Sequence, residues 1–290
     1  MTPWIEILDP DVKSKVGNIK YALIDFDGTV SVIRQGWEDV MIPMMIEMIC
    51  DGGPPTPMIE REVREYVDYS TGILTIKQME WLADAVRRYG IAKEPKSPYE
   101  YKRIYNDRML LHIEQRIKKL TDGVLKPDDL MIIGSRNFLE ELYKRGVIMY
   151  LASGTDHEHV LREASALKIT PYFGKRIYGA FDHTEAYTKE MVIQRILQEN
   201  NLQGKELLVI GDGPVEIRNA KSSGAIALGV ATDEVNRSGL NSHKRKRLID
   251  AGADLIIPDF TRYKDIIAFL FRNCLQKYAK RDIKLTLKLT

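Results

Sequence analysis

From Gly146 onward, short apolar runs of strand length alternate with longer segments of helical periodicity. Strands that alternate with helices in this way form a parallel sheet with helices on both faces. An earlier apolar run, residues 20–25, ends in acidic residues, as a buried parallel strand with a functional tip should. We therefore predict a doubly wound α/β fold. Its other strands are expected over residues 147–152, 207–210, 225–230 and 255–257, and its helices over 156–167, 189–199 and 215–222.

Over residues 36–125 the strand signals vanish, and apolar residues recur at helical spacing instead. The first apolar stripe contains four methionines, which could line an adaptable binding surface but are better explained as helix core. It is separated from the next helix by Pro54, Pro55 and Pro57. We predict an α/β core, residues 1–35 and 126–290, and a helical cap, residues 36–125, inserted into it.

The two ends of the chain also have strand-like patterns. Residues 4–8 are strand-like, and residues 283–290 alternate apolar and polar side chains with the period of a strand. We assign no function to either segment.

Composition places the chain in the ordinary globular class, with 290 residues, 44% hydrophobic residues, 29% charged residues and a net charge of +2. This balance does not favour nucleic acid or an acidic membrane as a partner. One basic run, Lys244 to Arg247, follows Asn241 and Ser242, which are plausible helix-start residues. We interpret the run as the solvated face of a helix rather than a nucleic-acid site.

The only cysteines, Cys50 and Cys274, lie far apart and lack metal-ligand spacing, so a disulfide framework is excluded and a reducing compartment fits best. The first residues lack the basic and apolar regions of a signal peptide. The most apolar stretch, residues 40–50, is shorter than the ~20 residues that span a bilayer. The expected location is therefore the cytoplasm.

Two carboxylates, Asp25 and Asp27, stand one residue apart at the tip of the first predicted strand, followed by Gly28 and Thr29. Alternate strand residues point the same way. Carboxylate and carbonyl oxygens suit magnesium, and a carboxylate can attack phosphorus to form an acyl-phosphate. Gly28 allows a sharp turn. The alternative, acidic turn residues without chemistry, is disfavoured because the five-residue pattern is specific.

Two further places hold polar groups next to predicted elements. Ser153 and Gly154 follow a strand, and Thr155 with Glu158 has the spacing of a capping box, which would create an anion site at a helix start. Lys189 opens a later helix. Taken separately, the first is often only a helix cap, and the second only a solvated lysine.

A fourth polar group follows the strand predicted over residues 207–210. Asp212 comes directly after that strand, and Glu216 follows at the start of a helix. Sites of parallel α/β sheets lie at the carboxyl ends of the strands, so Asp212 could reach a metal held by Asp25. Glu216 could orient the metal's ligands from behind. Glycine and proline beside Asp212 could be simple turn chemistry, but the acid pair favours a site.

These four motifs, in this order, resemble those of the haloacid dehalogenase superfamily. The resemblance spans Asp25 to Glu216 and implies an α/β core that binds Mg²⁺. It implies that Asp25 is the nucleophile and a metal ligand, and that Asp27 is the general acid/base with its main-chain carbonyl on the metal. Ser153, Gly154 and Lys189 would bind the phosphoryl group, Asp212 would be the third protein ligand, and Glu216 would stand behind it.

The resemblance also narrows the chemistry. Haloalkanoic dehalogenases of this superfamily lack the second aspartate, so Asp27 favours phosphoryl transfer. A long insert between Thr29 and Ser153 resembles the type-1 cap class, which includes phosphoglycolate phosphatase and β-phosphoglucomutase. Phosphonoacetaldehyde hydrolases of that class use a cap lysine, for which Lys77 and Lys93 are available by residue type.

We therefore expect a phosphatase that acts on a small phosphate monoester, with neither nucleic acid nor membrane as a partner. A phosphomutase is the first alternative, and a non-catalytic sugar-phosphate-binding module is the second. The sequence does not name the substrate. Residues that could face it, or equally could be cap surface, are Arg34, Trp37, Arg64 and the turn of residues 70–72.

Overall fold

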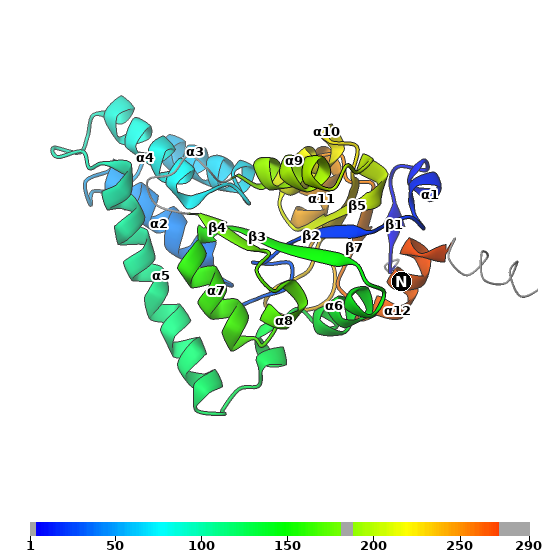
Figure 1. Ribbon diagram of the computed structural model, residues 1–290. Helices are drawn as coiled ribbons and strands as arrows, with labels where there is room; N and C mark the ends of the chain where they lie inside the picture. Colours follow the sequence, from blue (N-terminus) through cyan, green and yellow to red (C-terminus); the bar gives the residue numbers. More distant parts are fainter. Residues whose placement is uncertain (1–3, 181–187, 273–290) are drawn as a thin grey trace, which may run out of the picture.

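The computed structural model describes residues 4–180 and 188–272, which form one seven-stranded sheet with the order β1-β7-β6-β5-β2-β3-β4 (Figure 1). All neighbouring strands run parallel except β1, which pairs antiparallel with β7 at the edge. The doubly wound α/β prediction is confirmed. The strands are β1 Glu6–Ile7, β2 Tyr21–Asp25, β3 Ile148–Asp156, β4 Ile177–Ala180, β5 Leu207–Gly211, β6 Ile226–Val230 and β7 Leu255–Ile257.

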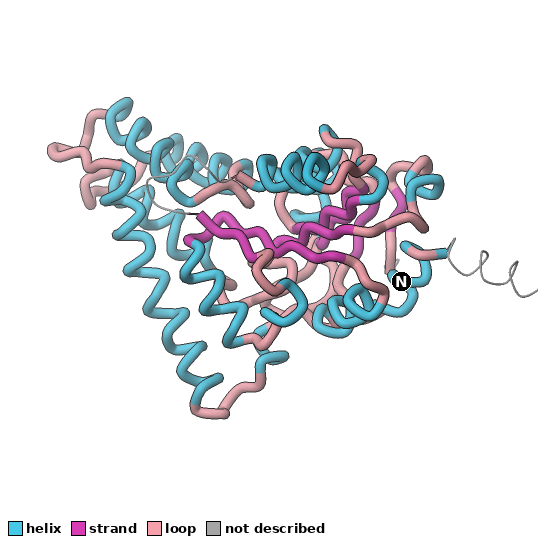
Figure 2. The backbone as a smooth tube through the Cα atoms, in the orientation of Figure 1, coloured by secondary structure: helices cyan, strands magenta, loops and turns pink. Residues whose placement is uncertain are grey.

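Helices cover both faces of the sheet (Figures 1 and 2). One face is covered by α9 Lys189–Glu199, α10 Pro214–Ser222 and α11 Ser242–Asp250. The other face is covered by α6 Ser135–Lys144, α7 His157–Ala166, α8 Thr170–Phe173 and α12 Tyr263–Leu270. Strand β2 serves both layers because its side chains alternate: Ala22 and Ile24 join one buried cluster, and Leu23 joins the other.

A helical insertion lies between β2 and β3, as the loss of strand signals predicted. It begins with α2 Trp37–Ile49, α3 Pro57–Tyr69, α4 Thr75–Tyr89 and α5 Pro98–Thr121. Pro57 and Pro98 stand at the first turn of their helices, where a missing N–H costs nothing. Buried Met41, Met44 and Met45 belong to the same apolar cluster as one face of the sheet, so the core interpretation of the methionines is confirmed.

The short elements outside these layers are α1 Val12–Lys15 and the 3-10 turns η1 Pro127–Leu130 and η2 Gly204–Glu206. Of the two strand-like ends, the first contributes the two-residue strand β1. The second, residues 283–290, lies outside the described residues. None of the helices in the described ranges is long and apolar enough to cross a membrane.

The strand expected over residues 147–152 continues four residues further than predicted. Strand β3 runs to Asp156, because its tip still pairs with β4 through Asp156 and Ala180 after a register shift. The predicted capping box of Thr155 and Glu158 is therefore wrong. Helix α7 begins after Asp156 without a side-chain cap, and the hydroxyl of Thr155 lies instead within 3.5 Å of Asp27 Oδ2.

Candidate active site

The predicted site residues meet because three neighbouring strands end at the same edge of the sheet. Strand β2 lies between β3 and β5, with Asp25 opposite Ala152 and Ile24 opposite Ile210. Ser153 comes directly after Ala152, and Asp212 comes two residues after Ile210. The pocket at this edge has a cavity volume of about 80 Å³. It is lined from the core by Asp25, Asp27, Ser153, Gly154, Thr155, Lys189 and Asp212, and from the insertion side by Arg34, Trp37, Met41, Thr71, Gly72, Ile73, Thr75, Gln78 and Tyr105.

Lys189 bridges two buried carboxylates at the centre of the site. Its Nζ lies 2.5 Å from Asp25 Oδ1 and also contacts Glu216 Oε1. Burial disfavours the ammonium form, but Asp25 and Glu216 outweigh burial and raise the pKa of Lys189. Lys189 is therefore a fixed positive charge, held where it can neutralise Asp25 and an incoming phosphoryl group.

Asp27 has a different set of neighbours. Its Oδ2 accepts hydrogen bonds from the hydroxyl groups of Ser153 at 3.0 Å and Thr155 at 3.5 Å. Its Oδ1 is buried, has no hydrogen-bond partner among the described residues, and lies 4.0 Å from Arg34 Nε. Burial raises the pKa of Asp27 to about 6, against the opposing charge of Arg34. A carboxyl group with this pKa can both donate and accept a proton near neutral pH.

Arg34 is held in the pocket wall by a buried ion pair that the sequence did not reveal. Its Nε and one terminal nitrogen donate to the carboxylate of Glu163 at 3.1 and 2.6 Å. Glu163 lies on α7, and Arg34 lies in the loop before α2. The bidentate geometry fixes the guanidinium of Arg34 in the pocket wall beside Asp27.

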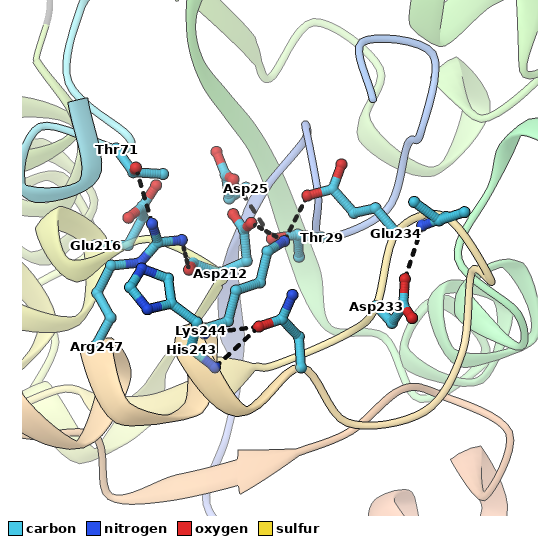
Figure 3. Close-up of polar contacts among 12 residues, drawn as sticks. Asp25, Thr29, Thr71, Asp212, Glu216, Asp233, Glu234, His243, Lys244 and Arg247 are labelled. Carbon is cyan, nitrogen blue, oxygen red and sulfur yellow. Dashed lines mark hydrogen bonds and ion pairs between the residues drawn. The ribbon is translucent and has the colours of Figure 1, made fainter. Parts of the chain in front are cut away.

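Asp212 is paired with a lysine that the sequence analysis assigned to solvent. Lys244 Nζ lies 2.5 Å from Asp212 Oδ2 and 2.5 Å from Glu234 Oε1 (Figure 3). Arg247 donates to the main-chain oxygen of Asp212 at 3.2 Å and to Thr71 Oγ1 at 3.0 Å. Although burial alone would raise it, Lys244 and Arg247 lower the pKa of Asp212.

The prediction that residues 244–247 form a solvated helix face is thus wrong for two of the four. Lys244 and Arg247 are only 8% and 9% exposed. They lie three residues apart, on the same side of α11 as buried Leu248. Lys246 points outward and pairs with Asp250. The helix start at Asn241, by contrast, is confirmed, because its side chain accepts from the backbone N–H groups of residues 243 and 244.

The groups expected to bind magnesium are oxygen donors, which suit a hard cation. Burial raises the pKa of Asp25; Lys189 opposes this, and the nearby carboxylates of Glu216 and Asp212 add to it. A divalent cation would relieve that repulsion. In residues 4–180 and 188–272, no three His, Cys, Asp or Glu side chains are grouped so as to hold a metal. The expected set is compatible with this, since it has two side-chain carboxylates and the main-chain carbonyl of Asp27.

The insertion reaches the site through the turn between α3 and α4. A Cβ on Gly154 would lie 2.2 Å from the carbonyl oxygen of Ile73, and one on Gly213 would lie 2.9 Å from that of Thr71. The turn therefore packs against glycine backbone on both sides. Of the residues suggested by sequence, Arg34, Trp37, Thr71 and Gly72 line the pocket. Arg64, Lys77 and Lys93 are exposed instead.

Replacing Gly154 with alanine should push this turn away from the pocket. The new methyl group meets backbone, which cannot rotate aside, so we expect kcat/KM to fall roughly tenfold to a hundredfold while the fold is kept. Steady-state kinetics with a phosphate monoester, the substrate class expected from the sequence, measure the effect. Gly53→Ala is a matched control, because Gly53 lies in an exposed loop. Unchanged kinetics for Gly154→Ala would contradict the packing of the turn onto the site.

Solved structures with this fold include several of haloacid dehalogenase-like proteins. A predicted phosphoglycolate phosphatase from Haemophilus somnus is 16% identical, with a TM-score of 0.57 over 86% of this chain and 98% of that one. A predicted phosphatase from Clostridium acetobutylicum is 16% identical, with a TM-score of 0.56 over the same shares. β-Phosphoglucomutase from Clostridium difficile is 15% identical, with a TM-score of 0.55 over 91% of this chain and 99% of that one.

At these identities the likeness establishes the fold alone. The sequence matches none of the curated proteins compared with it. A family model described as haloacid dehalogenase-like hydrolase, however, matches residues 19–224. That range is more than half of the chain and contains all four motifs at the pocket. The chain is therefore an enzyme that belongs to the haloacid dehalogenase-like hydrolase family.

Proposed function

We propose that this hydrolase is a magnesium-dependent phosphatase that cleaves a small phosphate monoester through an aspartyl-phosphate on Asp25. The observation that supports this proposal best is that the two aspartates at the tip of β2 have different neighbours. Asp25 is held by the ammonium group of Lys189, as a nucleophile needs. Asp27 is held by hydroxyl groups and has a pKa near neutrality, as a proton-transfer group needs.

In the first step, a carboxylate oxygen of Asp25 attacks phosphorus as the bond to the leaving oxygen breaks. Asp27 gives its proton to that oxygen, so the product leaves as an alcohol. In the second step, Asp27 takes a proton from water, which attacks phosphorus and releases inorganic phosphate and the Asp25 carboxylate. Lys189 and the hydroxyl of Ser153 would stabilise the negative charge on the phosphoryl oxygens. In phosphoryl transfer, positioning of the reactants and neutralisation of this charge provide most of the catalysis.

Asp25, the main-chain carbonyl of Asp27 and Asp212 would hold Mg²⁺, with Glu216 behind them. When bound, the ion supplies positive charge that neutralises the phosphate and relieves the repulsion between Asp25 and Asp212. Oxygen donors of this kind are those that magnesium prefers. Within residues 4–180 and 188–272, buried Glu216 Oε2 has no hydrogen-bond partner, so it could accept from a water molecule.

Charge distribution in the insertion favours hydrolysis over the phosphomutase alternative. A mutase must hold a bisphosphate, which calls for a second phosphate site, usually built from Arg or Lys. Three arginines of the insertion form salt bridges with carboxylates: Arg87 with Asp84, Arg88 with Glu62 and Arg108 with Glu47. Arg34 does line the pocket, but both carboxylate oxygens of Glu163 already neutralise it.

A panel of small phosphate monoesters, incubated with the purified enzyme and assayed for inorganic phosphate, tests the proposed activity. We expect turnover of esters whose leaving group fits beside Trp37, Gln78 and Tyr105. Hexose 1-phosphates with catalytic bisphosphate, followed by phosphorus NMR, test the mutase alternative. Isomerised sugar phosphate that accumulates faster than inorganic phosphate would overturn the assignment to hydrolysis.

Turnover should require a divalent hard cation. We expect Mg²⁺ to support activity, a chelator to abolish it, and Ca²⁺ to inhibit, because the larger ion takes extra ligands and would misalign Asp25. Activity measured in chelator, with Mg²⁺ and Ca²⁺ then added back in turn, checks this. An enzyme that keeps full activity in excess chelator would refute the magnesium requirement.

A further inference from the structure

A lysine ammonium group holds one carboxylate oxygen of Asp212, an expected metal ligand. Lys244 Nζ bridges Asp212 Oδ2 and Glu234 Oε1, at 2.5 Å from each. A Cβ on Gly28, the residue after Asp27, would lie 2.3 Å from the same Asp212 oxygen and 2.9 Å from the same Glu234 oxygen. The lysine and its two carboxylates are therefore packed against the turn that carries Asp25 and Asp27.

The backbone on either side of Lys244 is anchored. Asn241 Oδ1 accepts from the N–H of Lys244 and that of His243 at the start of α11. One turn later, Arg247 is tied to Asp212 O, Thr71 Oγ1 and Asp68 Oδ1. Figure 3 shows Lys244 and Arg247 reaching from α11 toward Asp212. A change in the position of Lys244 Nζ would therefore come from its side chain and not from its helix.

Asp212 and Glu234 give that side chain two partners of different kinds. Asp212 is an expected metal ligand, whereas Glu234 lies on the loop after β6 and forms no part of the expected donor set. A divalent cation on Asp212 would repel an ammonium group on the same oxygen. A buried charge requires a partner of opposite charge. Because Glu234 is present, the ammonium group of Lys244 can leave Asp212 and still have such a partner.

We propose that Lys244 is a tethered cation that competes with Mg²⁺ for Asp212, and that Glu234 receives it when the metal binds. Without metal, Lys244 neutralises Asp212 and keeps it oriented. With metal, Lys244 contacts Glu234 alone. The pair therefore sets the metal affinity of the site, and this inference rests on the metal site of the proposed function.

Direct Mg²⁺ titration of the purified protein by calorimetry tests this without any substrate. Lys244→Met removes the competitor, so we expect Mg²⁺ to bind at least about fivefold more tightly, which corresponds to roughly 1 kcal/mol. Glu234→Gln removes the alternative partner and should weaken binding by a similar factor. Lys246→Met is the matched control, because Lys246 is exposed on the same helix.

The double variant Lys244→Met/Glu234→Gln separates competition from a general effect of charge. It leaves the net charge of the site as in the wild type, so a long-range charge effect predicts unchanged affinity. Competition predicts tighter binding than in the wild type, because the ammonium group no longer occupies Asp212. Thermal unfolding with and without Mg²⁺ gives a second measure, since the tighter-binding variants should gain more stability from the metal.

Weaker Mg²⁺ binding in Lys244→Met, or unchanged affinity in the double variant, would overturn the inference. In that case, if the wild type binds Mg²⁺ and Asp212→Asn does not, the proposed metal site still stands. Absence of Mg²⁺ binding by the wild type would instead overturn the metal site of the proposed function. The titrations of the wild type and of Asp212→Asn therefore distinguish the two failures.

Discussion

Replacing Asp25 with asparagine should lower the turnover of any phosphate monoester by at least ~10³-fold, several kcal/mol of activation barrier, while the protein still folds. Asp25 stands at the tip of β2, between β3 and β5, and one of its carboxylate oxygens is held by Lys189 at the pocket. An amide cannot form the acyl-phosphate. In the substituted protein Lys189 keeps Glu216 as a partner, so we expect the buried lysine to remain compensated.

Asp107→Asn is the control for this variant, because it makes the same substitution at an exposed position of α5. Turnover should be unchanged in the control. Circular dichroism and thermal unfolding of both variants establish that the fold is kept. Activity of Asp25→Asn within tenfold of the wild type would contradict the covalent mechanism.

Replacing Asp27 with asparagine should lower turnover by about 10² to 10⁴-fold, the usual contribution of a general acid/base. The loss in the first step should depend on the leaving group. An alkyl phosphate needs a proton on its leaving oxygen, whereas a nitrophenyl phosphate leaves readily without one. The second step needs Asp27 for either substrate, because water must still lose a proton.

With the nitrophenyl ester, Asp27→Asn should therefore release a burst of nitrophenol and then stall. Rapid-mixing absorbance measurements on both the variant and the wild type follow this burst. The burst size should approach one nitrophenol per active site. Equal losses for alkyl and aryl esters, without any burst, would exclude the proposed role of Asp27.

Much of the fold and of the core site could be predicted because both depend on local patterns. The alternation of strands and helices sets the parallel sheet, and a parallel sheet brings its strand tips to one edge. Asp25 ends an apolar run, and Ser153 and Asp212 come after two others, so the sequence order already implied that these residues meet. Lys189 and Glu216 lie at the starts of two helices on the same face of the sheet. Lys189 Nζ contacts both Asp25 and Glu216, so the two helix starts meet at Asp25.

The roles of Lys244 and Arg247 could not be predicted in this way. Four consecutive basic residues are typical of a solvated helix face, and the partners of these two lie far away in the sequence. A signal was nevertheless present: residues 244, 247 and 248 share one side of a helix, and Leu248 is apolar. A buried lysine on that side requires an acidic partner, and only the tertiary structure identifies Asp212 and Glu234.

Contacts across the insertion were also beyond sequence reasoning. The buried pair of Arg34 and Glu163 joins the loop before α2 to α7, and neither residue belongs to a recognised motif. Gly154 resembled part of a helix cap, yet its backbone is the surface against which Ile73 packs. The helix cap predicted after Ser153 was wrong because β3 is longer than expected, and its tip stays paired with β4 beyond Ser153.

Chemical trapping of the intermediate tests the central claim most directly. Asp27→Asn is mixed with Mg²⁺ and nitrophenyl phosphate, quenched during the stalled phase and reduced with borohydride, which converts an aspartyl-phosphate to homoserine. Peptide mass spectrometry then identifies the altered residue, with a sample lacking substrate as the control. We predict homoserine at position 25 and unmodified aspartate at position 212. An unaltered Asp25 in a sample that has released its burst of nitrophenol would contradict the mechanism.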